Sequence, residues 1–301
     1  MAIADHRSGY VAVLGRPNVG KSTLVNALVG HKISIVSSKP NTTRHAIIGV
    51  LTDAGYQLVF IDTPGLESAS GRLINRVMNR AAVGSLESAD VVMLVVEAGS
   101  WKEGDDRALR LVAEAGLPCI LTVNKIDRVK PRDRLLPILE EAAGRAEFAA
   151  IVPVSATLPE NLGMLTTALY DLLPAQEALY GSEIATDRGL RFRAAEILRE
   201  KLMQMLHKEV PYGVGVEIED LEEDEQGRLR INATIWVDRE SHKGIVVGKG
   251  GQQIKAIGQA ARLDLQETLE RPVYLESHVK VKRNWSDSAQ SLRQLGYDAE
   301  Q

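Results

Sequence analysis

The segment Gly15–Ser22 constrains this chain more than any other sequence feature. It reads GRPNVGKS, fits the pattern G-x-x-x-x-G-K-[ST], and lies between the strand-like run Tyr10–Leu14 and a predicted helix. In that context the glycines let successive backbone N–H groups wrap a phosphate, and the positive end of the helix faces the anion. Lys21 is expected to reach the β- and γ-phosphates, and Ser22 to bind Mg²⁺. The segment therefore predicts a nucleoside triphosphate site.

From Tyr10 to about Pro174, short apolar runs alternate with longer helical stretches. Several runs are apolar throughout, as expected of strands covered on both faces of a parallel sheet. Residues 53–56 predict a hairpin turn, which makes Ala46–Thr52 an antiparallel edge strand. The pattern predicts an α/β fold for residues 1–174, the doubly wound, mostly parallel sheet of P-loop NTPases. The predicted strands are 10–14, 46–52, 57–61, 91–96, 119–123 and 149–154, and the predicted helices are 21–29, 72–84, 104–115, 132–144 and 161–172.

A second, smaller domain of a different kind is predicted for residues 191–301, after a linker at 175–190. Its order of elements is α+β, and it ends in a short helix and a C-terminal tail. The elements expected here are helices 191–206, 252–269 and 286–295, strands 214–218, 229–237 and 273–281, and an apolar strand-like stretch at 244–247. The run 217–225 carries seven acids and no base, and is predicted to be a solvated turn without function.

The tetrapeptide Asn124–Asp127 follows an apolar run, so it lies at the C-terminal end of a strand, where α/β sheets bind ligands. Guanine presents N1–H and N2–H₂ side by side, and the carboxylate of Asp127 can accept both bonds. Adenine offers no such pair, and a site built to bond a group rejects analogues that lack it. Ser155 and Ala156 follow the last strand of the sheet, and the Ala156 N–H is expected to face guanine O6. These residues predict GTP and GDP as the ligands.

Two further segments have the composition of nucleotide-dependent switches. In Asp62–Gly65 (DTPG), Asp62 is expected to hold Mg²⁺ through a water, and the Gly65 N–H to meet the γ-phosphate. In the loop Asn41–Arg44, a threonine can bind Mg²⁺ with GTP and let go after hydrolysis. Thr43 is preferred over Thr42, which stays as the alternative. The residue after Gly65 is Leu66, where many GTPases place a glutamine that orients the attacking water.

The glycine loop Gly248–Gly251 (GKGG) opens the predicted helix 252–269 and fits G-x-x-G, with which KH domains clamp about four nucleotides. Around it, residues 239–283 carry nine Lys or Arg against five Asp or Glu, although the whole chain has a net charge of −4. A locally basic face can bind phosphates on an acidic chain. The RNA contacts predicted here are Gly248, Lys249, Gly250, Gly251, Lys255, Lys280, Lys282 and Arg283.

Composition limits the cellular compartment in which the chain is expected and argues against secretion and membrane spanning. The single cysteine, Cys119, excludes a disulfide within the chain and fits a reduced cytoplasmic compartment. Residues 1–8 are polar and mixed in charge, which argues against a secretion signal, and no apolar stretch is long enough to span a membrane.

The first 174 residues resemble translation-factor-class small GTPases, specifically those in which a hydrophobic residue replaces the catalytic glutamine. Such proteins position water through backbone groups, a bound cation or a partner. Asn18 matches an asparagine that helps to hold a monovalent cation in potassium-activated members, so K⁺ is a candidate cofactor. With the KH-like unit, and with the tracts 184–197, 209–213 and 279–285, nearly the whole chain resembles the bacterial Era family. Ala185 and the spacing of the acidic run depart from that family outside its motifs.

The resemblance implies a monomeric switch that hydrolyses GTP slowly, binds the 3′ end of 16S ribosomal RNA and assists assembly of the 30S subunit. It also implies peripheral contact with the inner membrane. One alternative is an RNA chaperone with nucleotide-gated RNA binding and negligible turnover. Another is a tRNA-modification or large-subunit GTPase, although such relatives carry other flanking domains.

Apart from the RNA contacts, the expected site residues fall into three groups, which act in hydrolysis, bind metal ions or contact the nucleotide. Lys21, Thr43, Asp62 and Gly65 are expected to act in hydrolysis, with Ser22, Thr43 and Asp62 on Mg²⁺ and Asn18 on K⁺. The expected nucleotide contacts are Gly15, Arg16, Pro17, Asn18, Val19, Gly20, Lys21, Ser22, Thr23, Asp62, Thr63, Pro64, Gly65, Leu66, Asn124, Lys125, Ile126, Asp127, Ser155 and Ala156.

Overall fold

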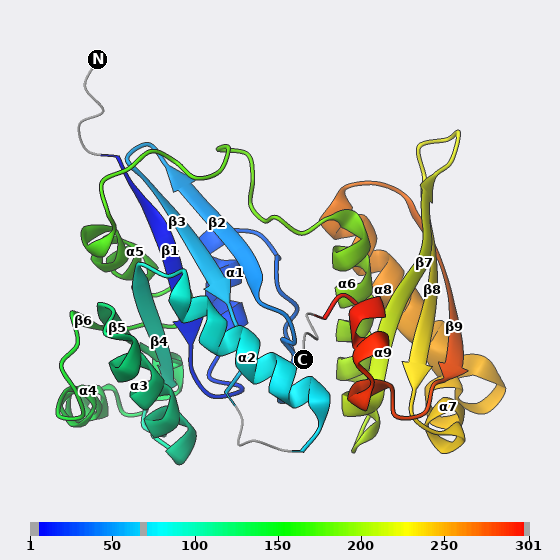
Figure 1. Cartoon of the computed structure of the whole chain (residues 1–301), viewed down its shortest axis with the longest axis horizontal. Helices are drawn as coiled ribbons and strands as arrows, with labels where there is room; N and C mark the ends of the chain where they lie inside the picture. The colour runs from blue at the N-terminus through cyan, green and yellow to red at the C-terminus, as the bar shows by residue number, and fades with distance from the viewer. Residues whose placement is uncertain (1–5, 67–70, 298–301) are drawn as a thin grey trace. The chain divides into compact units, whose positions relative to one another are not determined.

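The computed structural model describes residues 6–66 and 71–297. Segment 1–5, on which the argument against a secretion signal partly rests, lies outside the described residues. Within them, no helix combines the length and the apolar character needed to cross a bilayer. Backbone contacts divide the chain into two units with separate hydrophobic cores (Figure 1). The described residues of 1–34, 43–70 and 78–187 form the first unit, and those of 35–42, 71–77 and 188–301 form the second.

A six-stranded sheet runs through the first unit in the order β2-β3-β1-β4-β5-β6. At one edge β2 pairs antiparallel with β3, and the other neighbouring strands are parallel. This confirms the predicted mostly parallel sheet and its antiparallel edge strand. The strands are β1 (Arg7–Leu14), β2 (Ile47–Asp53), β3 (Tyr56–Asp62), β4 (Val91–Glu97), β5 (Cys119–Asn124) and β6 (Ala150–Pro153).

Helices cover both faces of this sheet. On one face, side chains of α2, α3 and α4 form a core cluster with the apolar residues of β4 and β5, Cys119 among them. On the other, α1 packs on β2 and β3, and α5 packs on β3, β5 and β6. Because both faces are covered, ligands can approach at the C-terminal ends of the strands. The helices are α1 (Lys21–Val29), α2 (Leu73–Glu87), α3 (Glu103–Ala115), α4 (Leu135–Ala143) and α5 (Leu162–Leu172).

The second unit has a three-stranded sheet of order β7-β8-β9, in which β7 and β8 are antiparallel and β8 and β9 parallel. Leu198 and Leu202 of α6 and Ile257 and Ala261 of α8 pack on one face of this sheet. On the opposite face lie the fully buried Trp285 and its edge-on neighbour Trp236. The elements are α6 (Leu190–Met205), β7 (Val214–Glu223), β8 (Leu229–Val237), α7 (Glu240–Val247), α8 (Gln252–Leu269), β9 (Val273–Val281) and α9 (Ala289–Gln294), with short 3₁₀ turns at Val210–Gly213, Lys249–Gly251 and Trp285–Asp287.

Two local predictions for this unit are wrong. The apolar stretch 244–247 is not strand-like, because it forms the second half of helix α7. There Val246 is buried in the core, while its neighbour Ile245 is half exposed. A run of four apolar residues does not by itself distinguish a strand from a helix. The acidic run 217–225 is mostly strand rather than turn, since β7 continues to Glu223 past a register shift between Ile218 and Asp220.

Predicted domain borders and structural units differ in their detail. Residues 175–187, expected as a linker, group with the first unit, and the second unit begins at Arg188. Two backbone N–H groups in this segment, those of Leu179 and Tyr180, donate to Oε1 of the fully buried Gln57, and the Val50 N–H donates to the carbonyl of Ala185. These hydrogen bonds hold the segment against β2 and β3.

Candidate functional site

The loop Gly15–Ser22 links β1 to α1, as predicted, and its backbone needs glycine at two positions, 15 and 20. Gly15 and Gly20 have φ of 148° and 100°, in a region that residues with a Cβ rarely adopt. A Cβ on Gly15 would lie 2.3 Å from the carbonyl oxygen of Val95, and one on Gly20 would lie 2.5 Å from Nδ2 of Asn124. The loop is therefore wrapped tightly between the ends of β4 and β5.

Lys21 lies inside this loop, with only 6% of its surface exposed. Its Nζ donates to the carbonyls of Gly15 (2.9 Å) and Arg16 (3.1 Å). Burial lowers the pKa of Lys21 to about 8, partly opposed by the charge of Asp62. A buried ammonium is a strong site for an anion, because little water competes for it.

The three predicted Mg²⁺ ligands lie together, and their chemistry fits the ion. Ser22 Oγ and Thr43 Oγ1 are hydrogen-bonded to each other at 2.7 Å. Asp62 is fully buried, and this burial raises its pKa although Ser22, Ser34 and Lys21 oppose the shift. Among the described residues, no group completes a hydrogen bond of good geometry with either carboxylate oxygen. Mg²⁺ takes hard oxygen ligands, few of them from the protein and the rest from phosphate and water. An orphaned carboxylate beside two hydroxyls matches that requirement.

The structure distinguishes the two threonines. Thr43 reaches the nucleotide loop through Ser22. The Thr42 hydroxyl instead donates to the carbonyl of Lys39 at 2.7 Å within its own turn. This geometry favours Thr43 as the switch threonine.

The segment Asp62–Gly65 approaches the phosphate loop closely. A Cβ on Gly65 would lie 2.6 Å from the backbone nitrogen of Pro17, so this position also needs glycine. Thr63 Oγ1 donates to the carbonyl of Val13 at 2.6 Å, which fixes the segment to β1. Leu66 is 5% exposed and packs in the core cluster with α2 and α3. An apolar side chain held in the core cannot orient a water molecule.

The residues predicted to recognise the base converge from the ends of β5 and β6. Ser155 Oγ donates to Asp127 Oδ1 at 2.7 Å, and because each carboxylate oxygen has two lone pairs, both oxygens can still accept from a ligand. The Ala156 N–H, expected to face guanine, donates to Asn124 Oδ1 at 3.2 Å. Two contacts to the phosphate loop were not predicted: Asn124 Nδ2 donates to the Val19 carbonyl (2.9 Å), and Lys125 Nζ to the Asn18 carbonyl (2.6 Å). The two loops are thus bonded to each other.

Glu97, the last residue of β4, also belongs to this site and was not among the predicted residues. It forms ion pairs with Arg16 and Lys125. The signal for it in the sequence is weak: an acid that ends an apolar strand next to two ligand-binding loops.

The glycine loop of the second unit connects α7 to α8. Gly248, Gly250 and Gly251 all have positive φ, of 72°, 61° and 77°. A Cβ on Gly248 would lie 2.6 Å from Cβ of Gln253, whereas Gly250 and Gly251 have open space around them. Lys249 and Lys255 are exposed on this side. The loop therefore presents bare backbone and the exposed Lys249, with the exposed Lys255 in the first turn of α8, as a strand-clamping loop requires.

The prediction of a single basic face around this loop is wrong. In β9, Val279 and Val281 face the core together with α8, so the alternating Lys280 points to the opposite side of the sheet. There it donates to Glu219 at 2.8 Å. Lys282 lies 3.5 Å from the centre of the Trp236 ring on that same side. Strand alternation separates these lysines from Lys249 and Lys255.

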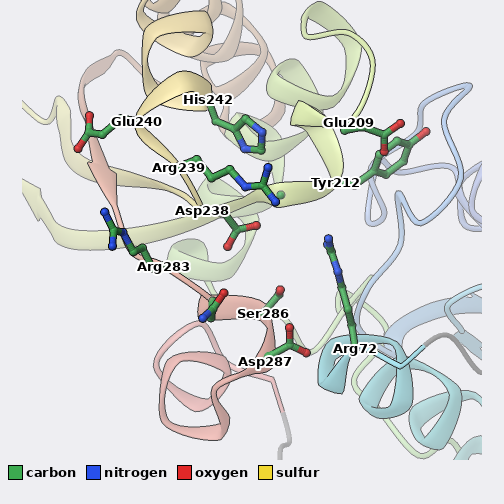
Figure 2. A pocket seen from close by; sticks show the side chains of 12 residues that line it. Arg72, Glu209, Tyr212, Asp238, Arg239, Glu240, His242, Arg283, Ser286 and Asp287 are labelled. Atoms are coloured by element: carbon green, nitrogen blue, oxygen red, sulfur yellow. The ribbon is translucent and has the colours of Figure 1, made fainter.

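Arg283 lines a cavity of about 590 Å³ in the second unit (Figure 2). Asp238, Arg239 and His242 line it from the end of β8 and the start of α7. Within the described residues, Asp238 Oδ1 and His242 Nδ1 are buried without a hydrogen-bond partner. The cavity is polar and of mixed charge, and it does not include the glycine loop.

Comparison with known proteins agrees with this geometry. The model of a family described as 50S ribosome-binding GTPase matches residues 10–125, and a KH domain model matches residues 209–286. GTPase Era of Xanthomonas axonopodis pv. citri (strain 306) is 50% identical over 295 residues, covering 98% of both chains. The chain belongs to the Era family of GTPases. It is therefore an enzyme that binds GTP and GDP and hydrolyses GTP, with a P-loop domain followed by a KH domain.

Other relatives support the same assignment over the full length. GTPase Era of Stenotrophomonas maltophilia (strain K279a) is 49% identical over 293 residues, covering 97% of this chain and 98% of the relative. A crystal structure of Era in complex with MgGDPNP and nucleotides 1506–1542 of 16S ribosomal RNA superposes with a TM-score of 0.94 at 39% identity, over 97% of this chain and 99% of that one. Together they favour this family over the tRNA-modification and large-subunit alternatives.

Proposed function

We propose that this GTPase binds the 3′-terminal region of small-subunit ribosomal RNA through its KH unit and assists assembly of the 30S subunit. The observation that carries the proposal is the glycine loop Gly248–Gly251, which exposes its backbone and Lys249 at the start of α8. The relative crystallised with nucleotides 1506–1542 of 16S ribosomal RNA supports the choice of RNA. GTP favours RNA engagement, and hydrolysis allows release.

In the nucleotide site, a few groups carry out the hydrolysis that times RNA release. Lys21 neutralises the β- and γ-phosphates from inside the loop, and the N–H groups of the loop and of Gly65 surround them. Ser22, Thr43 and Asp62 hold Mg²⁺, whose charge offsets that of the transferred phosphoryl group. Thr43 binds Mg²⁺ only while the γ-phosphate is present. Hydrolysis therefore releases Thr43, and this release changes the constraint on residues 35–42 just before it in the chain. Leu66 contributes no water-orienting group, so intrinsic turnover is slow.

Phosphate release with and without RNA tests this function. We expect steady-state GTP hydrolysis to change in the presence of a 3′-terminal 16S ribosomal RNA fragment, and a scrambled fragment of equal length to have no effect. Measured release indistinguishable from zero under both conditions would instead favour the RNA chaperone with nucleotide-gated binding.

We also propose that K⁺ serves as a cofactor beside the phosphates, with Asn18 as one of its ligands. Asn18 has φ of 64° at the turn of the loop, and Leu66 is an apolar side chain packed in the core. We expect hydrolysis to rise several-fold when K⁺ replaces Na⁺, because a site that fits the larger ion holds its positive charge beside the phosphates, whereas the smaller Na⁺ fits it less well. Equal rates across matched K⁺ and Na⁺ titrations would contradict the assignment, and Asn18→Ala should abolish the difference.

The family resemblance further supports a monomer located in the cytoplasm, with peripheral contact at the inner membrane.

A further inference from the structure

Glu97 occupies a position that the sheet topology makes unusual. It is the last residue of β4, which lies between β1 and β5. The phosphate loop follows β1 and the base loop follows β5, so Glu97 ends its strand between the two. In the parallel pairing of β4 with β5, Glu97 lies directly opposite Asn124, the first residue of the base loop.

The carboxylate of Glu97 contacts one cation from each loop. Its Oε2 accepts from Arg16 of the phosphate loop at 3.3 Å, and its Oε1 accepts from Lys125 of the base loop at 3.2 Å. These three side chains are 11–23% exposed, so the contacts are partly shielded from water. A third pair, with Arg128 at 3.5 Å, involves a side chain that is 68% exposed and contributes little.

Both cations have a second anchor. Arg16 Nε donates to the buried Asp105 at 3.0 Å, and Asp105 also accepts from the backbone N–H of Lys102 at the start of α3. Lys125 donates to the Asn18 carbonyl at 2.6 Å. Burial alone would raise the pKa of Glu97, but hydrogen bonds and charges from Lys125 and Arg16 outweigh it and lower that pKa. Glu97 is therefore ionised at neutral pH.

We propose that Glu97 is a positioning residue of the nucleotide site, which holds the phosphate loop and the base loop in register through Arg16 and Lys125. A guanine nucleotide must contact both loops at once, so an error in their spacing weakens every contact at the second loop. Without the carboxylate, Arg16 keeps Asp105, but Lys125 loses its ion pair and faces Arg16 as a like charge. Glu97 itself contacts neither the base nor the phosphates in this scheme.

Substitution of Glu97 by glutamine tests the proposal, because it removes the charge and keeps the shape. We expect fluorescent GDP and GTP analogues to dissociate about tenfold faster, as loss of a partly exposed charged hydrogen bond implies. Both nucleotides use both loops, so the ratio of GTP to GDP affinity should not change. The nucleotide-free protein should unfold at nearly the same temperature as the wild type. Glu141→Gln is the matched control, since Glu141 of α4 pairs with Arg145 just after that helix and is 68% exposed.

A double-mutant cycle separates positioning from a general loss of stability. If Glu97 acts through Lys125, Glu97→Gln combined with Lys125→Met should raise the dissociation rate no more than the larger single substitution does. Strictly multiplicative effects would overturn the proposal. So would a Glu97→Gln dissociation rate equal to that of Glu141→Gln. The family's GTPase activity would stand in either case.

Discussion

Replacing Asp127 with asparagine is expected to lower affinity for GTP by about 10⁴-fold, because the amide cannot accept from both N1–H and N2–H₂ of guanine. In the structure one carboxylate oxygen of Asp127 accepts from Ser155 at 2.7 Å, and each of the two oxygens keeps a lone pair that can accept from guanine. The variant should gain affinity for xanthosine triphosphate, whose 2-oxo group can accept from the new amide. Titration calorimetry with GTP, xanthosine triphosphate and ATP measures the affinity of the variant for each nucleotide.

A matched substitution controls for the general effect of losing an aspartate. Asp133 is exposed in the loop before α4 and is not among the residues of the nucleotide site. Asp133→Asn should leave all three affinities unchanged. If Asp127→Asn kept wild-type affinity for GTP, the assignment of the base-recognition residues would fail.

The second large effect is expected at the glycine loop of the KH unit. Placing aspartate at both Lys249 and Gly250 should abolish RNA binding, because two carboxylates would face the phosphates of the strand. Affinity for GTP should stay at the wild-type value. The structure indicates that the variant folds: Lys249 is exposed, and a Cβ on Gly250 meets no atom within 4 Å. Aspartate also tolerates left-handed φ better than most residues.

Binding to the 3′-terminal RNA fragment at several salt concentrations checks this prediction quantitatively. Each lost phosphate contact should reduce the logarithmic salt slope by about 0.7. Lys280→Asp provides the comparison, since that lysine lies on the other side of the sheet with Glu219. It should weaken binding far less than Lys249→Asp does. Equal losses at the two lysines would mean that RNA crosses the sheet face as well as the loop.

Much of the nucleotide site was predictable from local sequence. The spacing within Gly15–Ser22 defines a backbone path that only glycine permits at positions 15 and 20, and the structure shows both with positive φ. Asn124–Asp127 could be predicted as a ligand-binding segment because it comes at the end of an apolar strand, and strand ends are where a parallel sheet binds ligands. Thr43 could be preferred to Thr42 but not separated from it, because the choice depends on which hydroxyl reaches Ser22 across the fold.

What the amino-acid sequence determined by itself was therefore the chemistry of the loops and the order of the elements, since these depend on spacing and periodicity along a few neighbouring residues. Tertiary structure alone decided which distant groups meet. Strand order put Glu97 between Arg16 and Lys125, which are far from it along the chain. Strand alternation turned Lys280 away from the glycine loop, although Lys280 and Lys249 of that loop are both basic residues of one unit. Two side chains become partners only when the sheet fixes the register of their strands and the face on which each side chain lies. The spacing of nearby residues in the sequence determines neither.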